Sequence, residues 1–128
     1  MLTTNLLRSL SYLEDTCSTL LSHAKRENKY IADKPDTKEF LRFYKELTPF
    51  LQQYAVRQNN EVISELVHSL VEYPAVVEAY LNKRKSVWDV LSFNRDDKYY
   101  MHSEEYIRLL ETVCNAISNL IYQVKINL

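Results

Sequence analysis

The sequence predicts an all-α fold, a single-domain antiparallel bundle of four to five helices over residues 1–128. The 128 residues include no glycine, whereas average usage would supply about nine. Apolar residues recur at spacings of three and four along most of the chain, which is the period of an amphipathic helix. Without glycine, phosphate-binding loops, dinucleotide fingerprints and tight β-hairpins are disfavoured, because they need positive φ or close backbone approach.

The two ends of the chain predict the longest helices. The first begins at Thr3 or Thr4 and is expected to end near Asn28, because asparagine tolerates the left-handed conformation after a helix. The last begins at Ser103, a good N-cap with an acidic first turn. The predicted buried stripes are Leu6, Leu10, Leu13, Cys17, Leu20 and Ala24 in the first helix, and Tyr106, Leu110, Val113, Ile117, Leu120 and Val124 in the last.

The second helical stripe follows a turn predicted at residues 34–36. Asp36 is expected to start this helix, with Glu39 as its capping-box partner. Its apolar face reads Phe40, Tyr44, Leu47, Leu51 and Tyr54. Pro49 either kinks a continuous helix or occupies the first position of a new one capped by Thr48, and the sequence leaves both readings open.

The region between the second and last helices contains more predicted helix breaks than the rest of the chain. Asn59 and Asn60 predict a break, and Pro74 is expected to end or restart the helix that follows. Ser86 predicts the cap of a further short segment, and residues 94–98 predict a loop. The number of helices therefore depends on whether Pro49 and Pro74 kink or separate them.

The charge balance and the N-terminus predict a soluble, cytoplasmic protein. Charged residues make up 26% of the chain and the net charge is −1, so no overall field favours nucleic acid or an anionic membrane. The N-terminus lacks the pattern of a signal peptide, and no stretch approaches the roughly 20 apolar residues of a membrane span.

The two cysteines, Cys17 and Cys114, fall on apolar helical stripes far apart in the sequence. Free cysteine on such a stripe packs as a small hydrophobe, so both are predicted to be buried, reduced thiols. A disulfide or redox role is the alternative, although the sequence has neither a CxxC motif nor a secretory signal.

Glu65 and His68 form a Glu-x-x-His pair, flanked one turn away by Glu61 and Glu72. That spacing occurs in carboxylate-bridged di-iron bundles, which need a second such helix and two more inward glutamates. The other stripes offer tyrosine, phenylalanine and leucine instead. We therefore expect no metal site and no cofactor, with His68 at the core edge or on the surface.

One candidate for catalysis is Arg95, which is followed directly by Asp96 and, after six intervening residues, by His102. The pattern resembles the arginine–polar–x–histidine signature of the HEPN superfamily, all-helical bundles that often cleave RNA as dimers. The resemblance implies a metal-independent ribonuclease in which His102 moves the 2′-hydroxyl proton and Arg95 holds the phosphate. The alternative is a solvated loop with His102 just before the last helix.

Lys83, Arg84 and Lys85 form a basic run next to Trp88. Together with aromatic rings such a run can bind single-stranded nucleic acid or an acidic protein. Three cations at a helix end also interact favourably with its dipole, which is the structural alternative. Nucleic-acid binding through this run is therefore kept as an alternative function.

The function favoured by the sequence is a non-enzymatic helical protein–protein interaction module, an adaptor, regulator or inhibitor. The chain has ten tyrosines, more than one small core can bury with every hydroxyl bonded, and tyrosine is enriched in interfaces. A protein partner is expected, and self-association into a homo-oligomer is the alternative. The residues expected to contact the partner lie at predicted helix ends and loops: Tyr30, Tyr73, Lys83, Arg84, Lys85, Tyr99 and Tyr100.

Overall fold

The computed structural model describes residues 3–26, 32–92, 98–99 and 103–128, and all side chains in these ranges except those of residues 32–35, 82–92, 98–99 and 103. These ranges contain four helices: α1 (Thr3–Arg26), α2 (Lys34–Gln58), α3 (Glu61–Ser92) and α4 (Ser103–Ile126). The predicted all-α bundle is confirmed, with the lower of the two predicted helix numbers in the described part of the chain.

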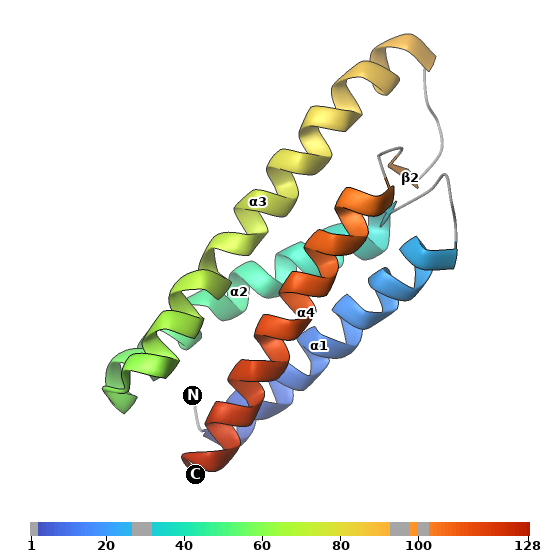
Figure 1. The fold of residues 1–128 in the computed structure, drawn as a ribbon. Coiled ribbons are helices and arrows are strands. Elements are labelled where there is room, and N and C mark those ends of the chain that lie inside the picture. Colours follow the sequence, from blue (N-terminus) through green and yellow to red (C-terminus); the bar gives the residue numbers. More distant parts are fainter. Residues whose placement is uncertain (1–2, 27–31, 93–97, 100–102) are drawn as a thin grey trace.

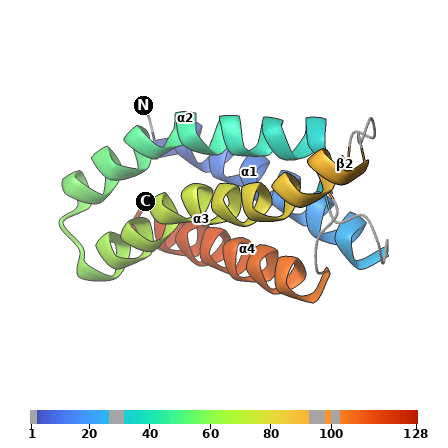
Figure 2. The same cartoon turned by 90° about the horizontal axis from the view of Figure 1, so that it is seen from above.

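The four helices pack in a ring, each against the next in sequence and α4 back against α1 (Figure 1). The contact between α1 and α4 is the most extensive of these. The start of α1, the end of α4 and the turn between α2 and α3 lie at the same end of the bundle in both views (Figure 2). Neighbouring helices are therefore antiparallel, as short connections require.

The core lies between the helices and is built from one apolar stripe per helix. All six stripe residues predicted for α1 are buried, as are all six predicted for α4. Burial of each large aliphatic side chain contributes roughly 1.5–3 kcal/mol, so these stripes supply most of the drive to form the bundle. The largest fully buried side chains are aromatic and aliphatic: Tyr44, Tyr54, Tyr106, Phe40, Leu6, Leu10, Leu13, Leu20, Leu51, Ile63 and Leu70.

Both internal prolines lie within continuous helices. α2 runs through Pro49 and α3 runs through Pro74, so neither proline separates two helices. The prediction of a separate short segment that starts at Ser86 is wrong, because α3 continues to Ser92. Pro49 has no N–H, so the carbonyl of Lys45 loses its helical donor. Both residues are exposed, and water can bond that carbonyl.

The missing hydrogen bond at Pro74 is replaced by a side chain of α2. Proline has no N–H, so the carbonyl of Leu70, four residues earlier, has no helical donor. The hydroxyl of Tyr44 donates to the Leu70 carbonyl, and both residues are buried. Burial raises the pKa of Tyr44, so this hydroxyl keeps its proton and remains a donor. A tertiary contact thus satisfies a carbonyl that water does not reach.

The turn between α2 and α3 uses two asparagines in place of the usual glycine. Asn59 has a positive φ of 49°, the left-handed conformation in which asparagine is tolerated better than most residues. The Oδ1 atom of Asn60 accepts hydrogen bonds from the backbone N–H of Val62 at 2.9 Å and of Ile63 at 3.3 Å. Asn60 is therefore the N-cap of α3, and the predicted break is confirmed.

Three local expectations need correction or fall outside the described residues. α2 begins at Lys34, not at Asp36, since proline is accepted in the first turn of a helix. Lys98 belongs to a two-residue strand, β2 (Lys98–Tyr99), which pairs antiparallel with β1 (Ala32–Asp33). A two-residue strand is too short to show any alternation in the sequence. The predicted end of the first helix at Asn28 lies outside the described residues.

Tyr44→Phe is expected to lower the free energy of unfolding by about 1–3 kcal/mol, because it leaves the buried Leu70 carbonyl without a donor. Urea unfolding of the variant and the parent protein measures the difference.

The control for this prediction is the same change in a Pro74→Ala background. Alanine at position 74 restores the backbone N–H that bonds the Leu70 carbonyl, so Tyr44→Phe should cost clearly less there. An equal cost in both backgrounds would show that the hydroxyl does not compensate for the proline.

Asn60→Ala is expected to destabilise the protein by about 1 kcal/mol, through loss of the N-cap of α3. Asn119, exposed within α4, offers a matched control, because asparagine to alanine in an exposed helix interior is neutral or slightly stabilising. Thermal unfolding of both variants tests this, and similar losses at the two positions would contradict the cap.

Candidate functional site

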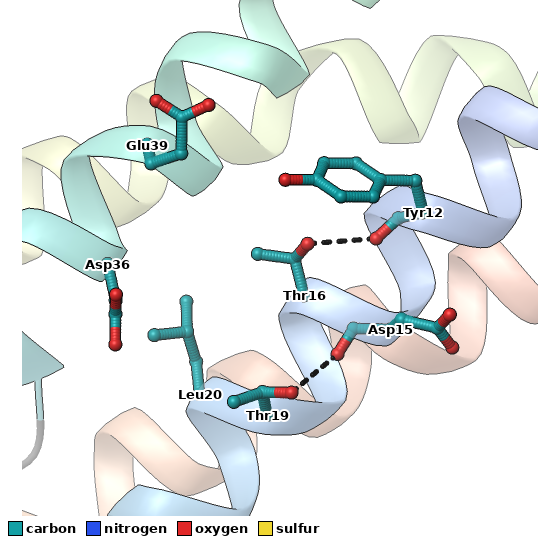
Figure 3. A pocket seen from close by; sticks show the side chains of 7 residues that line it. All are labelled: Tyr12, Asp15, Thr16, Thr19, Leu20, Asp36 and Glu39. Atoms are coloured by element: carbon teal, nitrogen blue, oxygen red, sulfur yellow. Dashed lines mark hydrogen bonds between the residues drawn. The ribbon is translucent and has the colours of Figure 1, made fainter.

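A concave site lies between α1 and the first turns of α2 (Figure 3). It has a volume of about 260 Å³ and is here named the α1–α2 groove. Three of its seven lining residues carry carboxylates, and Leu20 contributes apolar surface. The lining residues are Tyr12, Asp15, Thr16, Thr19, Leu20, Asp36 and Glu39.

Helix geometry explains how these side chains come together. Tyr12, Thr16 and Thr19 are spaced four and three residues apart, so they share one face of α1. The Thr16 hydroxyl donates to the carbonyl of Tyr12 at 2.9 Å, and that of Thr19 to the carbonyl of Asp15 at 3.0 Å. Because both threonine hydroxyls bond their own helix, the carboxylates and the Tyr12 ring dominate the chemistry of the groove.

Tyr12 is held in place by an aromatic neighbour on α2. Its ring meets that of Phe43 edge to face, with centroids 4.8 Å apart and an interplanar angle of 72°. Such a pair contributes about 0.5–1.5 kcal/mol beyond the area it buries. Half of Tyr12 is still exposed, at 50%. The groove therefore ends in an ordered aromatic ring with a free surface.

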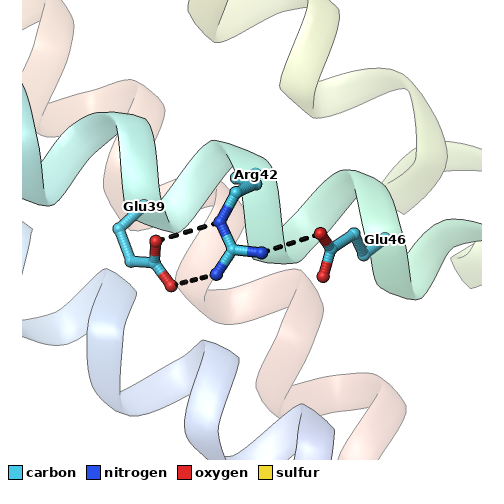
Figure 4. A network of polar contacts seen from close by, with 3 residues as sticks. All are labelled: Glu39, Arg42 and Glu46. Carbon is cyan, nitrogen blue, oxygen red and sulfur yellow. Dashed lines mark hydrogen bonds and ion pairs between the residues drawn. The ribbon is translucent and has the colours of Figure 1, made fainter.

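Glu39 belongs to a surface network with Arg42 and Glu46 (Figure 4). Arg42 Nε donates to Glu39 Oε2 at 3.0 Å, Arg42 Nη2 donates to the other oxygen of Glu39, and Nη1 donates to Glu46 Oε1 at 2.7 Å. These bonds to Arg42 lower the pKa of the Glu39 carboxyl. One guanidinium is shared by two carboxylates, so the network keeps one negative charge beside the groove.

The two cysteines meet on the other side of α1, at its contact with α4. Cys114 Sγ donates to Cys17 Sγ at 2.8 Å, and Cys17 Sγ donates to the carbonyl of Leu110 at 3.7 Å. Both are free cysteines. Cys17 is fully buried as predicted, but Cys114 is only half-buried because the buried stripe of α4 passes through its neighbour Val113. The expectation of two buried thiols on separate stripes is therefore corrected.

The residues singled out for metal binding lie on the surface of α3. His68 Nε2 is 3.5 Å from Glu72 Oε1, and both side chains are exposed. Glu61 and Glu65 are exposed as well. Within the described ranges, no three histidine, cysteine or acidic side chains are grouped so that they could hold a metal ion.

Most of the predicted contact residues fall outside the described side chains. Tyr73 is half-buried and packs against the core. Lys83, Arg84 and Lys85 lie in α3 and Tyr99 lies in β2, but their side chains are outside the described part. The same holds for the whole of Tyr30, Arg95, Tyr100 and His102. The ribonuclease and nucleic-acid alternatives therefore stay predictions from the sequence.

The sequence alone does not predict the α1–α2 groove as a site. Tyr12 sits at helical spacing from Thr16 and Thr19, directly beside the buried stripe of α1. That pattern marks the edge of an amphipathic face, where side chains of two packed helices meet. The pairing with Asp36 and Glu39 depends on how α1 and α2 pack, which local spacing does not contain.

Comparisons with known proteins give no family for this chain. No protein-family model matches the sequence, and no curated protein or solved structure is significantly similar to it. Within the described ranges, none of the helices combines the length and the hydropathy needed to cross a bilayer.

Cys114 is expected to react with iodoacetamide before Cys17 in the native protein. The hydrogen-bonded contact with Cys17 lowers the pKa of Cys114, while the contact with Cys114 and burial raise that of Cys17. Native labelling followed by peptide mass spectrometry measures the order, with labelling in urea as the control in which both react. Faster native labelling of Cys17 would contradict this geometry.

Proposed function

We propose that this chain is a non-enzymatic helical protein–protein interaction module whose α1–α2 groove receives a basic segment of its partner. The observation that carries the proposal is the combination, in one groove, of a half-exposed, ordered Tyr12 ring with the carboxylates of Asp15, Asp36 and Glu39. A groove of this kind offers both an anchor surface and charge complementarity.

The lining favours arginine as the residue that enters the groove. A guanidinium can bond a carboxylate with two parallel hydrogen bonds and stack on an aromatic face at the same time. Tyr12 and Asp15 lie three residues apart on α1, and Glu39 lies on α2 across the groove from them (Figure 3). The volume, about 260 Å³, suits one long side chain rather than a drug-sized ligand.

Two features support rapid, reversible binding. The acidic residues are at the surface, where they attract a basic segment over a Debye length of roughly 8–10 Å at physiological salt. The two helices that form the groove are held by the core, so binding needs little ordering of the protein itself. We expect this chain to act in the cytoplasm, as its sequence predicts, and to meet a protein partner there.

A fluorescent peptide with two arginines flanked by leucines serves as the probe. It is expected to bind the protein, with affinity falling as salt rises, and to perturb the amide signals of Tyr12, Thr16 and Glu39 in NMR titration. Tyr12→Ala should weaken binding about fivefold or more, the equivalent of about 1 kcal/mol. Tyr122, exposed on α4, is the matched control, and Tyr122→Ala should leave the affinity unchanged.

The charge component has its own control. Asp15→Asn should weaken binding and reduce its salt dependence, whereas Glu65→Gln, at an exposed carboxylate of α3, should do neither. Equal effects of the two changes, or amide perturbations concentrated away from the groove, would contradict the proposed site. Equal binding of a peptide with glutamates in place of the arginines would contradict its charge preference.

A further inference from the structure

Cys17 and Cys114 bring the first and last helices together at a single pair of sulfur atoms. The two residues lie 97 positions apart in the chain, yet their Sγ atoms are 2.8 Å apart. A disulfide bond measures about 2.05 Å, so the two sulfur atoms have to approach by roughly 0.8 Å more to form one. We propose that this pair is a redox-active dithiol, which hydrogen peroxide converts into a disulfide that joins α1 to α4. This inference does not rest on the proposed function of the groove.

Polar contacts between α1 and α4 flank the sulfur pair on both sides. Ser118 of α4 donates to the carboxylate of Glu14 on one side. On the other side, Lys25 Nζ lies 3.5 Å from Glu111 Oε1. Each contact joins α1 to α4, and the sulfur atoms lie between them along the seam. The short sulfur–sulfur distance is therefore part of an extended and specific helix contact, not an isolated approach of two side chains.

The two thiols differ in a way that assigns their roles. Cys114 is half-buried, so a small oxidant can reach it, and its hydrogen-bonded contacts with the thiol of Cys17 and the hydroxyl of Ser18 lower its pKa. These bonds outweigh the opposing effects of its own burial and of the negative charges of Glu14 and Glu111. Cys17 is fully buried. Cys114 is therefore the thiol that reacts with the oxidant. Cys17 is the thiol that then attacks the resulting sulfenic acid.

The reaction balances in two steps. The Cys114 thiolate attacks one oxygen of hydrogen peroxide, the O–O bond breaks, and the departing hydroxide takes a proton to form water. Cys114 is thereby oxidised by two electrons to a sulfenic acid. The sulfur of Cys17 then attacks the sulfur of Cys114, the S–OH bond breaks, and the hydroxide leaves with the proton of Cys17 as a second water. Two thiols and one peroxide give one disulfide and two waters.

The full chain, reduced and freed of reductant, is treated with equimolar hydrogen peroxide, alkylated in urea and mapped by peptide mass spectrometry. We expect a monomer lighter by two hydrogen atoms, no alkylation, and one linked pair of peptides that contain Cys17 and Cys114. Dithiothreitol should restore both thiols. The disulfide closes a long loop, so the thermal midpoint of the oxidised protein should rise by about 10 °C or more.

Two variants separate the roles of the thiols. In Cys17→Ser the sulfenic acid has no resolving partner, so dimedone should trap it at Cys114. In Cys114→Ser the same exposure should leave Cys17 reduced. If Cys17→Ser does not fold, peptide mapping of the parent protein decides the question alone.

Several outcomes would overturn the proposal. One is that both thiols can still be alkylated after peroxide treatment, and another is a disulfide between two copies of the chain. A third is a sulfinic acid at Cys114 beside a free Cys17. The last is a lowered thermal midpoint of the oxidised protein. The last outcome would mean that the bond distorts the seam between α1 and α4.

Discussion

The continuity of α3 through Pro74 depends on the hydrogen bond from the Tyr44 hydroxyl to the Leu70 carbonyl. Pro74 removes the helical donor of a carbonyl that is buried among the helices. A buried carbonyl without a donor would cost about 1–3 kcal/mol, a large part of the net stability of a small protein. The donor from α2 allows α3 to continue from Glu61 to Ser92, and it also ties α3 to α2.

The same helix, α2, supplies the outer wall of the α1–α2 groove. Arg42, Phe43 and Tyr44 are consecutive. Because an α-helix rotates by about 100° per residue, their side chains point in different directions. Tyr44 points into the core, Phe43 meets Tyr12 of α1, and Arg42 binds Glu39 and Glu46 at the surface. Because the core contact of Tyr44 restrains the rotation of α2, it also helps to place Phe43 and Glu39 against α1.

The sequence predicts the fold well because helical periodicity is a local property. The stripes of α1 and α4 are buried as predicted, and the break at Asn60 follows from the capping chemistry of its side chain. For the same reason, the two prolines leave the number of helices open. Their local effect is to interrupt a helix, but whether they do so depends on a donor such as Tyr44, 26 residues away from Leu70. Predicted partner contacts such as Tyr100 lie outside the described residues and stay predictions.

The candidate site and the sulfur pair show what helical periodicity in the sequence does not predict. Thr16 and Cys17 are neighbours in α1, yet Thr16 lines the groove toward α2 while Cys17 touches Cys114 of α4. Their spacing in the sequence gives the angle between them on the helix, and so predicts that they face different neighbours. It does not give the register of α1 against either neighbour, which decides that Glu39 and Thr16 line one groove and that Cys114 contacts Cys17. That register comes from the summed packing of the four stripes. A chemical site made by two helices can therefore be recognised only when the packing of the helices is known. This holds even where each of its residues lies in a helix that the sequence predicts.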